Sequence, residues 1–469
     1  MTTTHEIQAP SQATTGPSPS THPVDAIPPW PRLLMLSLQH VLAMYAGAVA
    51  VPLIVGGAMI DQGKMAPSDL PHLIAADLMV AGIATLIQAL GFRWFGVRLP
   101  IMQGCTFAAV SPMLIIGGQY GPAAIYGSVI ACGVAIILMA PLVGRLMWLF
   151  PPLVTGTIIL VIGLTLIPVS AEWIAGGSAA QGNGSFGSAG HVGLGLATLA
   201  IIALVQRFGP SWLSRISVLV GLVVGTLISL PLGLMDLAEF REQPVIAVAT
   251  PFFFGLPEFP VDAVLTMALV GLVIMIETTG AFIAVGEICD RPADRRAVAS
   301  GLRADGLSTI LGGVFNTFPY CAFSQNVGLV AISGVRSRYV AATTGGILII
   351  LGLLPKLGGL VAGIPTPVLG GATAALFGMI TAQGVKTLSR VELDPHSVTI
   401  IAVAVAAGLF PVVEPSIFSG FPSWFSTLFS SGIAVGSITA IALNLCFNGR
   451  SAAHSPAQSE TAETSVHHG

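Results

Sequence analysis

Apolar runs of about 20 residues, the length that crosses a bilayer as a helix, follow one another along nearly the whole chain. Their hydrophobicity is continuous rather than alternating, which indicates helices and argues against a β-barrel. We predict fourteen membrane spans, at residues 33–57, 70–92, 99–117, 121–143, 150–170, 192–206, 215–234, 262–287, 297–314, 323–335, 339–361, 365–386, 396–412 and 426–447. The predicted fold is therefore an all-α polytopic membrane protein.

Composition supports the bilayer as the solvent of this chain. Of its 469 residues, 54% are hydrophobic and only 8% are charged, whereas soluble domains carry about a quarter of their residues as charged types. The net charge of −3, without a basic run, excludes a nucleic-acid-binding protein. Five cysteines without paired spacing predict neither a metal site nor disulfides. No catalytic motif is present, so we expect neither an enzyme nor a cofactor.

Basic residues predict the orientation of the spans. With the N-terminus in the cytoplasm, Lys64, Arg241 and Lys356 are the basic residues that fall on the outer side. This asymmetry matches the excess of Lys and Arg in cytoplasmic loops. Residues 1–32 and 448–469 are polar and are expected to be disordered cytoplasmic ends. The chain is thus predicted to be a multi-pass protein of the bacterial inner membrane with both termini inside.

Fourteen spans divide into two halves of seven, and an odd number per half inverts the second half relative to the first. The third span in each half is interrupted by Gly, Pro or polar residues, at residues 99–112 and 316–328. Each reads as an extended stretch that leads into a short helix. Non-helical backbone at this depth needs cover by protein or a water-filled cavity. We expect the two segments to face each other around a small-molecule site near the midplane, although packed kinks are an alternative.

Two carboxyl groups lie within predicted spans. Glu277 is at the centre of the eighth span, where an isolated charge costs at least about 2.5 kcal/mol, so it requires a partner, a cavity or a ligand. A low-dielectric surrounding favours its neutral form, which suits a residue that takes up and releases a proton. A structural hydrogen bond is the alternative. Asp305 in the ninth span is either a second proton site or a hydrogen-bonding residue that fixes the helix of Glu277.

Polar residues also mark both broken segments. Gln325 and Asn326 offer amide donors and acceptors that match the edge of a purine, and Ser324 precedes them. At the corresponding junction, Phe107 could stack on a flat ring or fill apolar space, and Thr106 lies beside it. His40, in the first span, is expected to bond between helices. Asp77, near the outer end of the second span, is expected to be a structural or entrance residue.

The run Gln325-Asn326-Val327-Gly328, followed by Ser333-Gly334, resembles the signature of the nucleobase/ascorbate transporters, also called nucleobase:cation symporter family 2. Ser333 stands where Thr is usual. Further runs similar to the bacterial uric acid and xanthine permease branch are residues 315–319, residues 334–338, the pair Gln39-His40 and residues 277–280. The resemblance extends over residues 33–447.

This resemblance implies a core domain, a gate domain, and short strands in spans three and ten. The core would comprise residues 33–143 and 262–361, and the gate residues 150–234 and 365–447. It also implies a homodimer formed through the gates, an elevator-type movement of the core, and the proton gradient as energy source. Carried over by position, the substrate would be bound by Glu277, Gln325, Phe107, Thr106, Asn326 and Ser324. Binding and proton coupling would be supported by Glu277, Asp305, His40 and Asn326.

Two positions bear on the substrate that the resemblance implies. Uracil carriers have His where this chain has Ala281, which disfavours a pyrimidine. Xanthine-selective members tend to have Asn in place of Thr106, so uric acid is favoured and xanthine comes next. A carrier of uracil or another nucleobase remains an alternative. An anion exchanger of the same architecture is less favoured, because Glu277 would repel an anion at the site.

Overall fold

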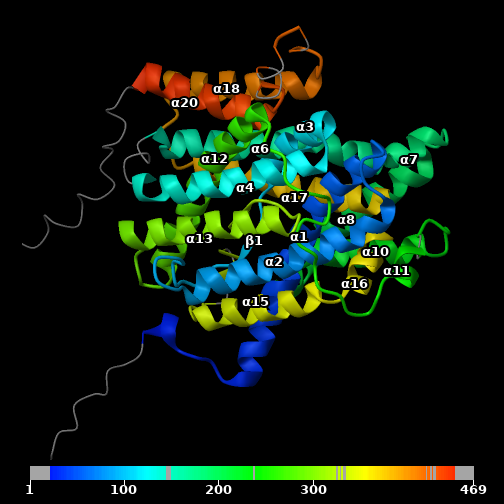
Figure 1. Cartoon of the computed structure of the whole chain (residues 1–469), viewed down its shortest axis with the longest axis horizontal. Coiled ribbons are helices and arrows are strands. Elements are labelled where there is room, and N and C mark those ends of the chain that lie inside the picture. The colour runs from blue at the N-terminus through cyan, green and yellow to red at the C-terminus, as the bar shows by residue number, and fades with distance from the viewer. Residues whose placement is uncertain are drawn as a thin grey trace, which may run out of the picture.

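The computed structural model describes residues 22–143, 149–235, 238–323, 326–327, 329–330, 334–418, 420–422, 425 and 429–448. Most helices run side by side along the long axis of the molecule (Figure 1). The longer helices are α1 (Trp30–Asp61), α2 (Leu70–Leu90), α3 (Val110–Tyr120), α4 (Pro122–Met139), α6 (Pro152–Ile174), α8 (Ala189–Phe208), α10 (Ser217–Ser229), α12 (Val261–Ile288), α13 (Arg295–Val314), α15 (Arg338–Gly352), α16 (Pro355–Ala362), α17 (Thr366–Leu388), α18 (Pro395–Val413) and α20 (Gly432–Asn448).

Eight helices within the described ranges are long and apolar enough to cross a membrane. A ninth span is possible if α15 and α16 count as one, although the chain bends by 78° between them. Three shorter apolar helices cover Phe107–Tyr120, Ser217–Ser229 and Gly432–Asn448. The chain is therefore a mostly helical, multi-pass membrane protein, while the count of fourteen spans stays a prediction.

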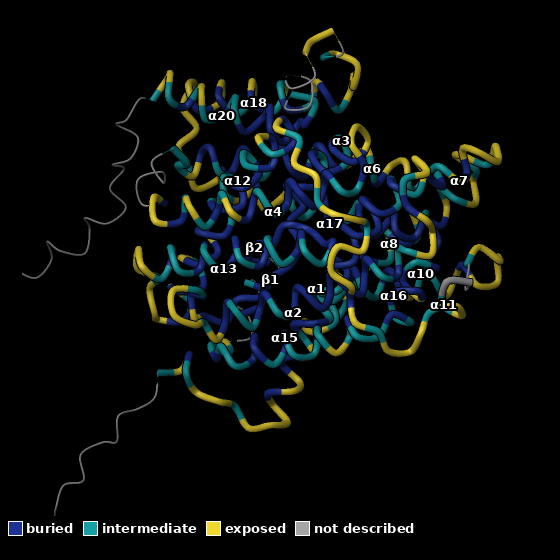
Figure 2. The backbone as a smooth tube through the Cα atoms, in the orientation of Figure 1, coloured by how far each residue is buried: buried dark blue, intermediate teal, exposed yellow. Residues whose placement is uncertain are grey.

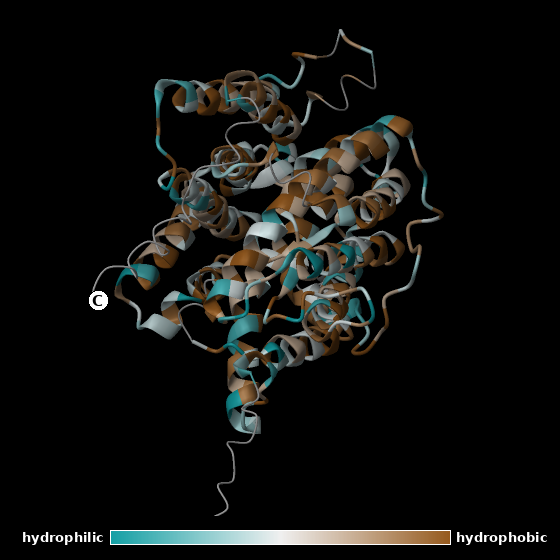
Figure 3. Cartoon of the chain, turned by 90° about the vertical axis from the view of Figure 1, so that its left-hand side faces the viewer, coloured by the Kyte–Doolittle hydropathy of each residue, from teal (hydrophilic) through white to brown (hydrophobic). Residues whose placement is uncertain are grey.

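Burial separates central helices from peripheral ones. In α2, 78% of the apolar span is buried by other parts of the protein, against 22% in α8 and 28% in α18. The buried residues concentrate around the middle of the bundle, and the exposed ones at its rim and ends (Figure 2). Seen from one end, most of the helical ribbon is hydrophobic (Figure 3). Exposed apolar side chains such as Val413 and Phe208 suit contact with lipid rather than water.

The N-terminal end corrects one expectation. Residues 22–32 were expected within a disordered segment, but Pro23–Asp25 form a short 3-10 helix and α1 begins at Trp30. Val24 is fully buried. Asp25 forms ion pairs with Arg291 at 3.0 Å and Arg338 at 2.8 Å. These contacts tie the segment that precedes α1 to distant parts of the chain.

Two helix pairs pack closely because glycines face each other. A Cβ on Gly82 of α2 would lie 2.5 Å from the carbonyl oxygen of Gly345 of α15. In the same way, a Cβ on Gly133 of α4 would lie 2.5 Å from the carbonyl oxygen of Gly306 of α13. Small residues allow such close backbone approach between membrane helices. The two crossings hold α2 and α13, the helices that flank the two broken segments, against the rest of the bundle.

The α2–α15 crossing gives a stability prediction. Gly345→Val should separate the two helices and destabilise the protein by about 1–3 kcal/mol, the usual cost of overpacking. The measurement is the midpoint of thermal unfolding in detergent, read as loss of the monodisperse peak. Gly346→Val is the matched control, because a Cβ at Gly346 meets no atom within 4 Å. Equal stability of both variants would contradict the glycine crossing.

Two short strands lie at the centre of the bundle, within the two broken segments predicted at residues 99–112 and 316–328. Strand β1 (Gln103–Cys105) pairs antiparallel with β2 (Tyr320–Ala322), and Gly104 lies opposite Cys321 at the middle of the pair. Two flanking backbone bonds extend the ladder, from Thr106 N–H to the Pro319 carbonyl and from Phe323 N–H to the Met102 carbonyl, both at 2.9 Å. The broken segments therefore meet, as the sequence predicted.

Candidate functional site

Each strand is anchored by a threonine of the preceding helix. The backbone N–H of Gln103 donates to Thr85 Oγ1 of α2 at 3.0 Å, and the N–H of Tyr320 donates to Thr309 Oγ1 of α13 at 3.2 Å. Both threonines are fully buried. Because these N–H groups lie deep in an apolar bundle, they need such partners. The two helices thereby hold the strand pair in position.

A cavity of about 190 Å³ lies beside the strand pair. One wall consists of residues 105–108 and 321–323, where the strands end, together with Glu277 of α12. The opposite wall comes from α6 and α17, through Ile159, Ile162, Met379, Ile380 and Gln383. An apolar enclosure with a few polar groups is typical of a small-molecule site. The cavity therefore brings Thr106, Phe107 and Glu277 together, as expected for a binding site.

Among the described residues that line this cavity, Glu277 is the only carboxylate. Its side chain is partly exposed to the cavity and makes no hydrogen bond or ion pair with a described residue. A carboxyl group at membrane depth without a protein partner is available to a ligand or a proton. The alternative expectation, a structural hydrogen bond, has no partner within the described ranges.

Phe107 and Thr106 lie at the start of the short helical segment that follows β1. The ring of Phe107 packs edge-on against Phe377 of α17, with centroids 5.7 Å apart and an interplanar angle of 85°. This contact fixes the ring while one side of it lines the cavity. Thr106 Oγ1 accepts a hydrogen bond from Ala108 N–H at 3.2 Å, so its hydroxyl caps the turn, and the residue is part of the cavity wall.

His40 and Asn326 contact each other. Asn326 Nδ2 lies 2.9 Å from His40 Nδ1 and donates to the His40 carbonyl at 3.3 Å. This bond joins α1 to the residues after β2, which is the bonding between elements that the sequence favoured for His40. Asn326 Oδ1 is buried without a partner among the described residues. Ser324 and Gln325, the other candidates here, lie outside the described residues.

Comparison with known proteins decides the family. Residues 31–417 match the model described as Permease family. The chain is 42% identical to the xanthine permease of Bacillus subtilis (strain 168), over 89% of this chain and 94% of that protein. It is 43% identical to the uric acid permease PucJ of the same bacterium, over 89% of this chain and 93% of that protein. It is 42% identical to the uric acid transporter UacT of Escherichia coli (strain K12), over 95% of this chain and 91% of that protein.

This chain belongs to the nucleobase/ascorbate transporter family. It is a permease, not an enzyme.

Solved structures support the transporter fold of this permease. The transmembrane domain of the cyanobacterial bicarbonate transporter BicA matches with a TM-score of 0.59 and 18% identity, over 87% of this chain and 98% of that one. The structure of SLC26A9 matches with a TM-score of 0.51 and 14% identity, over 89% of this chain and 69% of that one. At these identities the likeness concerns the fold alone.

Asp305 of the permease lies behind the strands and does not line the cavity. Its Oδ1 accepts hydrogen bonds from Gln103 Nε2 at 2.9 Å and from Gln88 Nε2 at 2.8 Å. Gln88 also donates to the Gly301 carbonyl at 3.1 Å. Asp305 is fully buried, and its Oδ2 has no partner among the described residues. This carboxyl therefore joins β1 and α2 to α13.

Asp77 of α2 makes the corresponding contact with the other strand. Its Oδ1 accepts a hydrogen bond from Tyr320 Oη of β2 at 2.7 Å. Asp77 is fully buried, so the entrance role considered for it is wrong and a structural role is favoured. Each strand thus begins with a residue, Gln103 or Tyr320, whose side chain reaches a carboxyl group of the other half of the chain.

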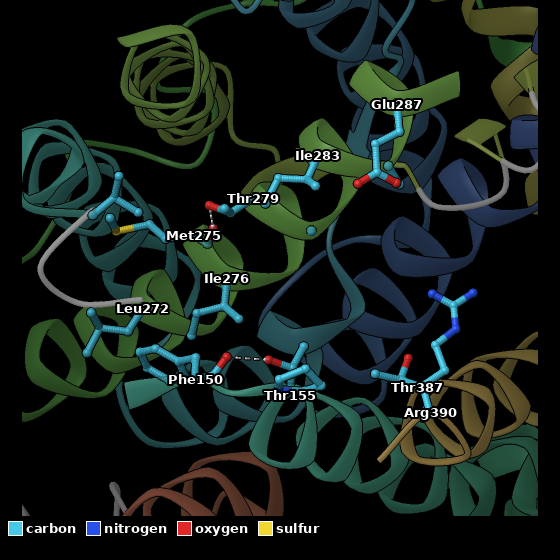
Figure 4. A pocket seen from close by; sticks show the side chains of 14 residues that line it. Phe150, Thr155, Leu272, Met275, Ile276, Thr279, Ile283, Glu287, Thr387 and Arg390 are labelled. Atoms are coloured by element: carbon cyan, nitrogen blue, oxygen red, sulfur yellow. Dashed lines mark hydrogen bonds between the residues drawn. The ribbon is translucent and has the colours of Figure 1, made fainter. Parts of the chain in front are cut away.

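A second, larger cavity adjoins the first. It measures about 470 Å³ and lies between α12 and the ends of α6 and α17, with Glu287 and Arg390 at its edge (Figure 4). A narrow space lined by Ile158, Val273 and Glu277 lies between the two cavities. It shares Thr155 with the larger cavity and Glu277 with the smaller. Glu277 is therefore approached from the end of α12 that carries Glu287.

Sequence reasoning missed two groups of residues. Gln88 and Gln103 connect Asp305 to β1, and the available signal was an amide within each apolar run. Gln383 lines the cavity from α17, and it too is an amide in an apolar helix. Ile159 and Ile162 carry no signal, because apolar residues facing a cavity look like those facing lipid.

Proposed function

We propose that this permease imports a purine base, uric acid or xanthine, together with a proton across the bacterial inner membrane. The relatives named as xanthine and uric acid permeases support the substrate class. The observation that carries the proposal is the cavity in which the carboxyl of Glu277, without a partner among the described residues, lies beside Phe107, Thr106 and Gln383. A purine offers ring N–H groups to a carboxylate and a flat face to an aromatic ring.

In the proposed binding mode, Glu277 accepts hydrogen bonds from the base and Phe107 contacts its face. Gln325, Asn326 and Ser324 would complete the site from the other broken segment. Thr106 is a small hydroxyl residue in the cavity wall, and its similarity to uric acid carriers favours uric acid over xanthine. His40 would support the site through its hydrogen bond to Asn326.

We also propose that the chain consists of two inverted seven-span repeats. Four matched contacts support this arrangement: the two glycine crossings, the Thr85 and Thr309 anchors, the pairing of strands centred on Gly104 and Cys321, and the Asp305 and Asp77 bonds across the pair. The contacts of Thr85 and Asp77 on α2 with the two strands have counterparts in those of Thr309 and Asp305 on α13. Inverted repeats commonly place their substrate site at the interface between the halves.

The proposed movement is that of an elevator. The core, residues 33–143 and 262–361, would carry the strand pair and Glu277, while the gate, residues 150–234 and 365–447, would form the opposite wall. Support comes from the small cavity, whose two walls divide along this boundary. The larger cavity beside Glu287 would be the cytoplasmic access route, with both termini on that side. Dimerisation through the gates remains an expectation from the family.

Uptake by cells that express the permease tests the proposal. We expect labelled uric acid or xanthine to accumulate, and a protonophore to collapse that accumulation, because a proton-coupled carrier cannot concentrate its substrate without the proton gradient. Unlabelled uric acid and xanthine should compete, whereas uracil and sulfate should not. Accumulation that follows a sodium gradient instead would overturn proton coupling, and competition by uracil or sulfate would overturn the purine assignment.

A further inference from the structure

A depression of about 740 Å³ lies at the end of the bundle where α13 begins, on the left in Figure 1. It is formed by the loop between α2 and β1 and by residues 291–303 around the start of α13. Its lining includes six arginines: Arg93, Arg98, Arg291, Arg295, Arg296 and Arg303. Within the part of the chain that the structure describes, Asp294 is the one carboxylate that lines it.

The positive charge of this depression is largely uncompensated. Arg291 pairs with Asp25, but the other five arginines make no ion pair with a residue in the ranges that the structure describes. Asp294 uses its carboxylate to cap α13, accepting from Ala297 N–H at 2.7 Å. Arg295 and Arg296 occupy the first turn of α13, where the helix dipole is also positive. Basic residues at this end of a helix add to the positive potential of the dipole and thereby favour the binding of an anion nearby.

The loop that forms the other wall is strained. Arg93 and Arg98 adopt positive φ angles of 47° and 57°, a region that costs a non-glycine residue about 1 kcal/mol or more. The loop is nevertheless fixed on both sides, because Gly96 N–H donates to the Ser300 carbonyl at 3.0 Å and Arg98 N–H to the Gln88 carbonyl at 3.1 Å. The strained backbone therefore holds two arginines beside those of α13.

Exposed aromatic residues lie on this loop beside its arginines. Trp94, which lines the depression, is 65% exposed, and Phe92 is 46% exposed. Exposed aromatic rings beside arginines are typical of the lipid headgroup region. We propose that the depression binds the phosphate headgroup of an anionic phospholipid from the cytoplasmic leaflet. The arginines supply the charge and the forked donors that suit a phosphate, and the neighbouring aromatic rings contact the upper acyl chain.

Bound lipid would act on the strand pair through Gln88. Its Oε1 accepts from Val97 N–H of the loop at 2.8 Å, while its Nε2 donates to Asp305 at 2.8 Å. The loop continues directly into β1 through residues 99–102. A headgroup that joins the loop to α13 would thus stabilise the position of β1, although it lies outside the proposed substrate site.

Lipid binding by the purified full-length permease tests this proposal without reference to its substrate. We expect native mass spectrometry to show phosphatidylglycerol retained in preference to phosphatidylcholine. Arg295→Gln with Arg296→Gln should weaken phosphatidylglycerol binding by about thirtyfold, since each basic residue near an anionic headgroup contributes about a factor of five. Arg207→Gln with Arg215→Gln is the matched control, which removes two charges outside the depression and should bind as the wild type does.

The remaining measurements separate the possible ligands. Arg93→Gln, at an exposed loop position, provides a second variant if the double variant does not fold, and it should weaken binding about fivefold. Inorganic phosphate at millimolar concentration should neither displace the lipid nor raise the thermal stability. If phosphate alone stabilises the wild type as well as phosphatidylglycerol does, the site serves a soluble anion and the lipid assignment is overturned. Equal phosphatidylglycerol binding by the wild type and both arginine variants would also overturn it.

Discussion

Glu277→Gln is expected to abolish accumulation of labelled uric acid or xanthine while the protein remains folded in the membrane. Glu277 is the one carboxylate among the described residues that line the small cavity, and none of the described residues forms a hydrogen bond or ion pair with it. The amide keeps the size of the side chain but neither binds a proton nor accepts charge-assisted hydrogen bonds. Loss of such a bond costs about 1.5–3 kcal/mol, or roughly tenfold to a hundredfold in affinity, and loss of the proton site removes the driving force.

The measurement is initial uptake and steady-state accumulation, normalised to the amount of protein in the membrane. Glu287→Gln is the matched control, because Glu287 lies on the same helix but at the edge of the larger cavity. It should accumulate substrate nearly as the wild type does. Exchange by Glu277→Gln in preloaded proteoliposomes, without a gradient, would show whether binding survives when coupling is lost. Normal accumulation by Glu277→Gln would remove this residue from the mechanism.

Hydropathy located most helices closely, because apolar length alone decides whether a segment can cross the bilayer. The predicted span 262–287 corresponds to α12 (Val261–Ile288), and 365–386 to α17 (Thr366–Leu388). The span 339–361 instead divides into α15 and α16, which are bent by 78° at Pro355. A window average is insensitive to such a bend, since both parts are apolar.

The candidate site could be predicted as far as polar residues mark it. Thr106, Phe107 and Glu277 stand out in apolar runs, and the structure brings them to one cavity. Contacts such as Gln103 with Asp305 could not be predicted, because the two residues are separated by about two hundred positions and meet only where β1 packs against α13 in the folded bundle. Partner choice of this kind depends on three-dimensional packing, which a single sequence does not specify.

Asp305→Ala is expected to reduce the yield of folded protein severely. The carboxyl accepts hydrogen bonds from Gln88 and Gln103, and all three side chains are fully buried. Alanine would leave two amide donors to find other acceptors, at about 1–3 kcal/mol each. Gln88 keeps one bond, to the Gly301 carbonyl. The total cost is therefore about 2–5 kcal/mol, a large part of the 5–15 kcal/mol that typically stabilises a folded protein.

Asp305→Asn distinguishes the hydrogen-bonding role of this side chain from its ability to take up a proton. Its carbonyl oxygen can accept both amide bonds, so the monodisperse fraction after detergent extraction and the thermal midpoint should stay near the wild-type values. Equal stability of the alanine variant would contradict the scaffold role. Uptake by the folded Asp305→Asn variant, measured against external pH, then distinguishes the two roles that its position in the ninth span suggested. An unchanged pH dependence identifies Asp305 as the residue that positions β1, whereas a lost pH dependence identifies it as a second proton site, since the amide keeps one acceptor oxygen but cannot take up a proton.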